Sequence, residues 1–206
     1  MKLGVDTSTN VLSIALEGSG LSANMEIRKK SAGSQQVAGI VEFLLQKLNK
    51  SASDIQEAYA GNGPGSFTGI RVALSFINTL SQTLRIPVAS VSSLDLLAFG
   101  CGAWYTSVIP FIRSRKNEVF TAYYERGGRV TDYLVLDRDD FLTFIRERSP
   151  RTITAPDDEL KDYAHLDLPG SFLASNPSAR FIFSLADELK IEPEHGYLKP
   201  AYLRSF

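Results

Sequence analysis

Hydrophobic positions near the start of the chain follow a strand pattern and then a helical one. Three short runs, at residues 3–5, 11–17 and 21–28, predict a three-stranded meander with Asp6 at its first corner. Over residues 34–49 the apolar side chains recur at i, i+3, i+4, i+7, i+8 and i+11, which predicts an amphipathic helix. The same reasoning predicts the rest of this half: a strand at 57–61, a helix at 68–85, a strand at 88–91 and a helix from Ser92 to Leu97.

The second part of the chain repeats this order in a less regular form. A strand is expected at 107–113, followed by a hairpin of 118–125 with 129–136 that turns at Gly127–Gly128. The remaining predictions are a helix at 139–148, a strand at 152–155, and a final helix at 179–191, with 149–177 as the least regular segment. The repeated order predicts two related α/β halves, residues 1–100 and residues 101–206.

The second predicted helix has a wide apolar arc. Eight of its side chains between Ile70 and Leu84 span roughly 200° of a helical wheel, about twice the stripe needed to lie on one sheet. Either the first helix covers the additional face, or the two helices share an exposed apolar face that recruits a partner. We expect the second arrangement. The expected partner surface comprises Val37, Ile40, Val41, Leu44, Leu45, Leu48, Ile70, Ala73, Leu74, Phe76, Ile77 and Leu80.

A glycine-rich segment, Gly-Asn-Gly-Pro-Gly-Ser-Phe-Thr-Gly at residues 61–69, directly precedes that helix. It lacks the lysine of a Walker A loop, and Thr68 stands where a dinucleotide-binding loop has its third glycine. The segment is therefore either a phosphate loop or a tight strand-to-helix turn capped by Ser66 or Thr68. In the first case the phosphate site would comprise Asp6, Thr7, Ser8, Gly63, Gly65 and Ser66, at the carboxyl ends of the strands.

Composition limits the remaining chemistry. The 206 residues carry a net charge of −1, so no bulk positive field attracts nucleic acid, and the single Cys101 allows no internal disulfide. The two histidines, His165 and His195, are far apart, and neither a metal-binding pair nor a nucleophile elbow occurs. With no signal peptide and no apolar run approaching the ~20 residues that cross a bilayer, we expect a cytoplasmic protein without membrane contact.

Two charged clusters remain. Arg113, Arg115 and Lys116 follow a predicted strand, where they either meet a phosphate or guard the sheet edge against aggregation. The carboxylates at residues 157–159 are expected to form a solvated surface run rather than an acid–base pair.

Several segments together resemble the TsaB (YeaZ) family. Leu-Gly-Val-Asp-Thr-Ser-Thr at residues 3–9 is similar to the start of that family, and Gly-Pro-Gly-Ser-Phe-Thr-Gly-Ile-Arg at 63–71 is similar to its central signature nearly letter for letter. Supporting similarities lie at 87–94, 118–120 and 200–204. The chain departs from the family at Ser34–Gln35, where many relatives have a histidine, and at residues 113–115, where they have Asp-Ala-Arg.

The resemblance implies an actin-like, sugar-kinase-like ATPase fold made of two RNase H-like halves. It also implies a non-catalytic subunit that partners the paralogue TsaD, with the ATPase TsaE, in forming threonylcarbamoyladenosine beside the anticodon of tRNAs that read ANN codons. The two helices of the N-terminal half would bind TsaD, or a second copy when the protein is alone, and tRNA would be contacted only indirectly. No cofactor is expected, with at most weak binding of ATP or ADP at the glycine loop.

The residues agree with this implication at two points. The first predicted helix has no His-x-x-x-His metal pair, which the catalytic paralogue carries there. The paralogue's glycine-rich adenine segment is also missing, because Gly127–Gly128 is expected to be a hairpin turn. The alternative from a different class is an ATP-dependent phosphotransferase that uses Asp6, Thr7 and the amides of the glycine loop.

Overall fold

The computed structural model describes residues 1–28, 33–115, 117–201 and 203. Lys116 of the basic cluster, and Tyr202 and Arg204 of the closing similarity, lie outside the described residues. The chain divides into two compact units, one made of Met1–Ser93 with Pro177–Ala201 and the other mainly of Leu94–Asn176. Among the described residues, no helix is both long and apolar enough to span a membrane.

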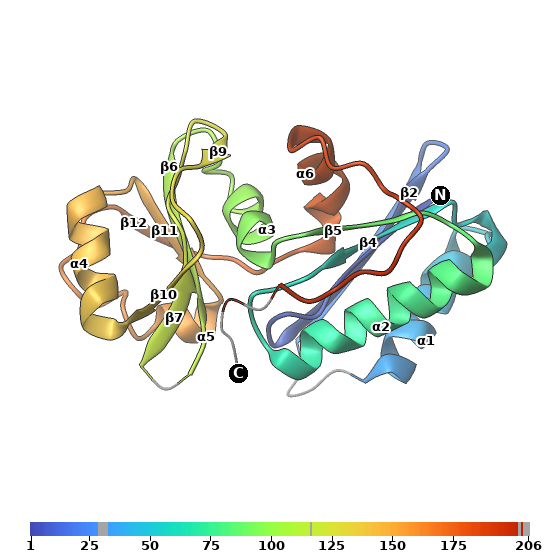
Figure 1. Cartoon of the computed structure of the whole chain (residues 1–206), viewed down its shortest axis with the longest axis horizontal. Coiled ribbons are helices and arrows are strands. Elements are labelled where there is room, and N and C mark those ends of the chain that lie inside the picture. Colours follow the sequence, from blue (N-terminus) through green and yellow to red (C-terminus); the bar gives the residue numbers. More distant parts are fainter. Residues whose placement is uncertain (29–32, 116, 202, 204–206) are drawn as a thin grey trace. The chain divides into compact units, whose positions relative to one another are not determined.

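The first unit is a five-stranded sheet in the order β3-β2-β1-β4-β5. Its strands are β1 (Lys2–Asp6), β2 (Val11–Gly18), β3 (Leu21–Arg28), β4 (Glu57–Gly61) and β5 (Val88–Val91). The first three strands are antiparallel, whereas β1, β4 and β5 are parallel. Helices α1 (Ser34–Lys47) and α2 (Phe67–Leu84) lie side by side against this sheet, and α6 (Ile182–Glu188) packs on it with the short η2 (Ala179–Phe181) (Figure 1).

The two faces of β1 show why helices cover both sides of this sheet. Leu3 and Val5 are fully buried in the core cluster that α1 and α2 share. Gly4, between them, faces the other way, where a Cβ atom would lie 2.5 Å from Cγ2 of Ile182. Side chains alternate along a strand, so neighbouring positions belong to opposite layers. This packing returns residues 177–201 to the first unit, whereas the sequence placed them in the C-terminal half.

The second unit repeats the strand order of the first. Its sheet runs β10-β7-β6-β11-β12, with β6, β11 and β12 parallel and β7 antiparallel to both β6 and β10. The elements are β6 (Ser107–Arg113), β7 (Glu118–Thr121), β8 (Tyr124–Glu125), β9 (Gly128–Arg129), β10 (Leu134–Asp137), β11 (Thr152–Ala155), β12 (Ser171–Ala174), α3 (Ser93–Gly100), α4 (Arg138–Arg148) and α5 (Asp157–Leu160). The predicted pair of RNase H-like halves is thereby confirmed.

Two details of the second unit differ from the sequence prediction. The hairpin turns at Arg126–Gly127, not Gly127–Gly128, because Glu125 pairs with Gly128 and both turn residues have positive φ, 53° and 82°. The segment that looked least regular contains α5 and β12, which are only four residues each. Elements this short offer few positions for a periodic pattern, and of the three in this segment the sequence predicted only β11.

Candidate functional site

The predicted phosphate-site residues meet at the carboxyl end of β1. Asp6 is fully buried, and its Oδ1 accepts hydrogen bonds from the Ser8 backbone N–H (2.9 Å) and the Ser8 hydroxyl (2.7 Å). Its Oδ2 accepts from the Ser93 hydroxyl at 2.8 Å. Burial raises the pKa of the Asp6 carboxyl, while the hydrogen bonds from Ser8 and Ser93 act in the opposite direction.

The glycine loop is bound to the turn that follows β1. The Ser66 backbone N–H donates to the Ser8 carbonyl at 2.7 Å, and the Thr7 hydroxyl donates to the Gly69 carbonyl at 2.5 Å. Ser66 also caps α2, because its hydroxyl accepts the Gly69 N–H at 3.2 Å. The expected cap at Ser66 is confirmed. The Ser66 amide and hydroxyl and the Thr7 hydroxyl therefore all form hydrogen bonds within this chain.

Two glycines are required by these contacts. A Cβ atom at Gly65 would lie 2.3 Å from the Ser8 carbonyl oxygen, and one at Gly69 would lie 1.9 Å from the Thr7 carbonyl oxygen. Gly65 also has a φ of +149°. The close approach that glycine permits is therefore made to the strand turn itself. Two carbonyl oxygens facing the loop make its inner side unfavourable for a phosphate, although nucleotide binding here stays an untested prediction.

The expected partner surface on α1 and α2 needs a correction. Eight of its twelve side chains have at most 5% of their surface exposed and belong to the core of the first unit: Val37, Val41, Leu44, Leu45, Ile70, Ala73, Leu74 and Ile77. Of the eight side chains in the wide arc of α2, four are buried in this core and four are half-buried, which favours the arrangement that the sequence left as the alternative. The other four of the twelve side chains are half-buried and pack against the margin of this core: Ile40, Leu48, Phe76 and Leu80.

An apolar groove nevertheless lies between the two helices. It has a volume of about 460 Å³, and its apolar lining comes from Ala38, Val41, Leu45, Ala52, Ile55, Phe76 and Leu80. Polar side chains including Glu42, Gln46 and Lys50 also line it. The sequence prediction missed Ala38 and Ile55, since neither stands out in a helical pattern, and it placed Phe43 only outside the stripe of the first helix.

Two large aromatic side chains on the same helices, outside the groove lining, are also exposed. Phe43 on α1 is 44% exposed, and Phe67 at the start of α2 is 42% exposed. Each has a cation over its ring, Lys47 at 5.4 Å and Arg71 at 3.8 Å from the ring centroid. Large exposed aromatics beside an apolar groove are typical of protein-binding surfaces.

A match to known families decides the identity of this fold. Residues 26–145, more than half of the chain, match the family described as TsaD: tRNA N6-adenosine threonylcarbamoyltransferase. The chain belongs to the TsaD family.

Within the TsaD family the chain is similar to proteins named TsaB. It is 28% identical to the tRNA threonylcarbamoyladenosine biosynthesis protein TsaB of Bacillus subtilis over 98% of this chain and 93% of that protein. It is 33% identical to the Escherichia coli protein of the same name over 60% of this chain and 54% of that protein. The resemblance to TsaB (YeaZ) proteins is confirmed.

Solved structures agree on the fold. A protein of Pseudomonas aeruginosa, described as uncharacterized and similar to peptidase YeaZ, superposes with a TM-score of 0.82 at 25% identity over 98% of this chain and 99% of that one. YeaZ from the same organism gives a TM-score of 0.78 at 24% identity, with the same coverage. The expected actin-like fold is confirmed.

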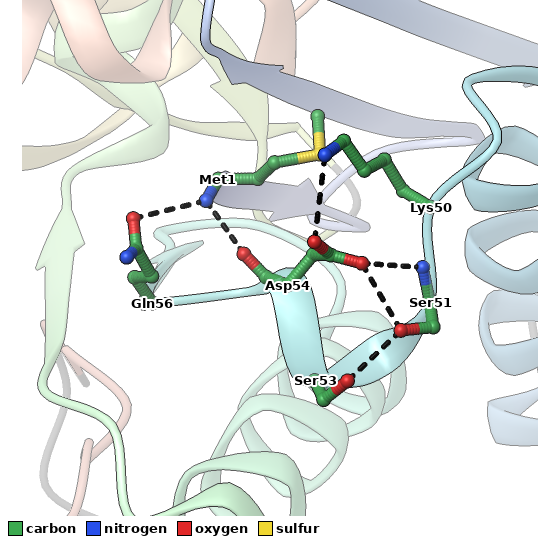
Figure 2. A network of polar contacts seen from close by, with 6 residues as sticks. All are labelled: Met1, Lys50, Ser51, Ser53, Asp54 and Gln56. Atoms are coloured by element: carbon green, nitrogen blue, oxygen red, sulfur yellow. Dashed lines mark hydrogen bonds and ion pairs between the residues drawn. The ribbon is translucent and has the colours of Figure 1, made fainter.

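The groove of this TsaD-family chain is closed at one end by a short helical segment, η1 (Ala52–Asp54), which the N-terminus secures. The Met1 ammonium group donates to the Asp54 carbonyl at 2.6 Å and to Oε1 of Gln56 at 3.3 Å (Figure 2). The Asp54 carboxylate in turn accepts from the Ser51 backbone and hydroxyl and pairs with Lys50. These bonds lower the pKa of Asp54, chiefly through the Ser51 contacts. The network holds Ile55 at the groove wall.

Among the described residues no group of three or more histidine, cysteine, aspartate or glutamate side chains could hold a metal ion. His165 and His195 are both exposed. The features described in the first unit are the hydrogen bonds around Asp6 and the apolar surface of the groove.

Proposed function

We propose that this chain acts in the biosynthesis of tRNA threonylcarbamoyladenosine as a non-catalytic subunit that docks a TsaD protein through the outer surface of α1 and α2. The pathway follows from the names of its relatives in Bacillus subtilis and Escherichia coli. The docking role rests on one observation, the apolar groove of about 460 Å³ between α1 and α2. Association with TsaE through that complex, and a homodimer when the partner is absent, are further parts of the proposal.

The chemistry of the groove supports a protein occupant. Its floor is apolar, and Glu42, Gln46 and Lys50 stand among the residues that line it. An apolar centre with polar side chains around it is the usual composition of a protein interface. A large apolar side chain of the partner would bury itself there, as central anchor residues do at energetically important positions.

Nothing in the loop around Asp6 favours the phosphotransferase alternative. The Ser66 amide and the Thr7 hydroxyl already bond to this chain, and the glycines fit the carbonyls of Thr7 and Ser8. We therefore propose that the glycine loop has a structural role in this chain and does not bind a phosphate for catalysis. Calorimetry with ATP and magnesium tests this: saturable binding with turnover would support the phosphotransferase.

Ala38→Arg is the variant that tests docking. Ala38 is exposed on α1 and lines the groove, so an arginine there fills the groove with a charged side chain while remaining a good helix former. We expect binding to the TsaD partner to weaken by at least about tenfold, as for loss of an anchor contact. Binding is measured by titration calorimetry of the two purified proteins.

Gln82→Arg is the matched control, because Gln82 is exposed on α2 and is not among the residues that line the groove. The control should bind as the parent chain does. Equal binding by the Ala38 variant would refute the interface. Leu44 is unsuitable for this test because it is only 5% exposed, so its replacement by a charge would disrupt the core.

A further inference from the structure

A second cavity lies at the ligand-binding edge of the other sheet. It has a volume of about 150 Å³ and lies among Arg113, Asn117, Arg138, Glu159, Asp162 and Tyr163. Arg113 ends β6, Glu159 follows β11 within α5, and Arg138 follows β10 at the start of α4. These three strands run in the same direction, so their carboxyl ends share one edge of the sheet.

The position of this cavity matches a general rule of α/β sheets. From β6 the chain passes to β7 on one side, while β11 lies on the other side. Ligands of open α/β sheets bind at such a switch point, outside the carboxyl ends of the strands. The strand order makes this the counterpart of the Asp6 site in the first unit, which the chain itself fills.

The cavity presents charges of both signs. The Arg113 guanidinium pairs with Asp162 at 2.5 Å, and the Arg113 backbone N–H donates to Oε2 of Glu159 at 2.5 Å. Arg138 lies over the Tyr163 ring at 5.1 Å, and its Nη2 donates to the Asp162 carbonyl at 3.4 Å. It has no ion-pair partner among the described residues. The remaining N–H groups of the Arg138 guanidinium and Oε1 of Glu159 are thus left for a ligand. The sequence expected Glu159 to be in a solvated run, but it is half-buried.

We propose that this cavity binds a small zwitterionic amino acid, with its carboxylate on Arg138 and its ammonium group on Glu159. The cavity volume of about 150 Å³ leaves room for a molecule of this size. Arginine binds a carboxylate with two parallel hydrogen bonds. A free phosphate fits less well, because Glu159 and Asp162 line the same space and would repel a dianion.

Binding should depend on pH through Glu159. Burial raises the pKa of its carboxyl to about 7, Arg113 acts in the opposite direction, and Asp158 and Asp162 contribute to the increase. Arg138 of α4 and Glu118 of β7 are the other charged groups at the cavity. Since an ammonium group binds the ionised carboxylate, affinity should fall as the pH falls through about 7.

Calorimetry of the full chain with four amino acids (glycine, L-alanine, L-serine and L-threonine) tests the proposal. We expect at least one to bind saturably at pH 8 and more weakly at pH 6. Propionate, which has no ammonium group, and ethylamine, which has no carboxylate, should not bind. No saturable binding by any of the four, or binding of propionate as tight as that of the amino acids, would overturn the proposal.

Glu159→Gln separates a ligand contact from a structural effect. The amide oxygen still accepts the Arg113 backbone N–H, so the fold is retained, but the negative charge is lost. Affinity for the amino acid should fall by about tenfold, as for the loss of a charge-assisted hydrogen bond, and its pH dependence should disappear. Asp158→Asn, on the exposed neighbour that does not line the cavity, is the control and should bind unchanged at pH 8, where Glu159 is mostly ionised with or without the Asp158 charge. Unchanged binding by Glu159→Gln would contradict the assignment of the ammonium site.

Discussion

At the scale of single residues, buried carboxyl groups hold the strand ends of both units. Asp6 forms no ion pair within the described part of the chain and is held by three hydrogen-bond donors from Ser8 and Ser93. Asp95 plays a similar part in the second unit, where the hydroxyls of Tyr124 and Tyr133 donate to it at 2.5 and 2.8 Å. Burial raises the pKa of both carboxyls, which means that keeping them ionised inside the protein costs free energy. Their hydrogen bonds connect neighbouring elements in return.

Glu159 gives the stability of the ligand-free protein a pH dependence that can be measured. Its pKa is about 7 in the folded chain and near 4.5 when unfolded, so the folded state binds more protons between these values. The contribution of Glu159 to stability therefore falls as the pH rises from about 4.5 to 7. In urea unfolding, the difference between Glu159→Gln and the parent chain should shift in favour of the variant over this window. A difference that does not change with pH would contradict the raised pKa.

At the scale of elements, the glycine loop and α2 form one unit with the turn after β1. Ser66 caps the helix, and the carbonyls of Thr7 and Ser8 lie where Cβ atoms of Gly69 and Gly65 would be. The loop therefore sets the position of α2 on the sheet and, through it, one wall of the groove. A signature that looks like a phosphate loop in the sequence is explained here by packing.

Gly69→Ala tests this explanation. Alanine normally stabilises a helix relative to glycine, but here its Cβ would lie 1.9 Å from the Thr7 carbonyl oxygen. We expect a loss of about 2–4 kcal/mol in the free energy of unfolding, measured in urea. Gly39→Ala on α1 is the control, because a Cβ there meets nothing within 4 Å, and it should gain about 0.5–1 kcal/mol. Equal effects of the two substitutions would show that the contact with Thr7 does not constrain the loop.

At the scale of the whole molecule, the chain leaves the first unit at residue 93 and returns to it at residue 177. On return, Phe183 packs edge-on against Tyr59 at 5.4 Å between ring centroids, and Glu194 pairs with Val88. The second unit keeps a complete core of its own, including the Phe111, Phe141 and Tyr163 rings at 5.0–5.4 Å. Each unit should therefore fold only with its own segments.

Fragments test this division. Residues 94–176 should unfold cooperatively on heating, because they contain α3, whose Leu94 and Leu97 lie in the core and whose Asp95 binds Tyr124. Residues 101–206 lack the whole of α3 and carry residues 177–201, which belong to the first unit. We expect no cooperative transition by circular dichroism for this second fragment. The opposite result would restore the boundary at residue 100.

The sequence by itself determined most elements and their order along the chain. Period-two and period-3.6 patterns placed β3, β4, β6 and β11 at their observed bounds, because each lies between clear turn residues. The pattern also brought Asp6 and the glycine loop to one sheet edge, which the structure shows. Those properties are local, or follow from topology, so spacing along the chain is enough to reveal them.

Tertiary structure alone decided which surfaces are available. The broad arc of α2 has the same pattern whether α1 or a partner covers it. Burial in the core shared with α1 settles the question for four of its eight side chains, Ile70, Ala73, Leu74 and Ile77. In the sequence, the glycines are explained equally well by a phosphate or by a carbonyl group close to the backbone. The structure has the carbonyl oxygens of Thr7 and Ser8 in contact with Gly69 and Gly65. Burial and close approach depend on residues distant in sequence, so a periodic pattern cannot identify the group that occupies the opposite side.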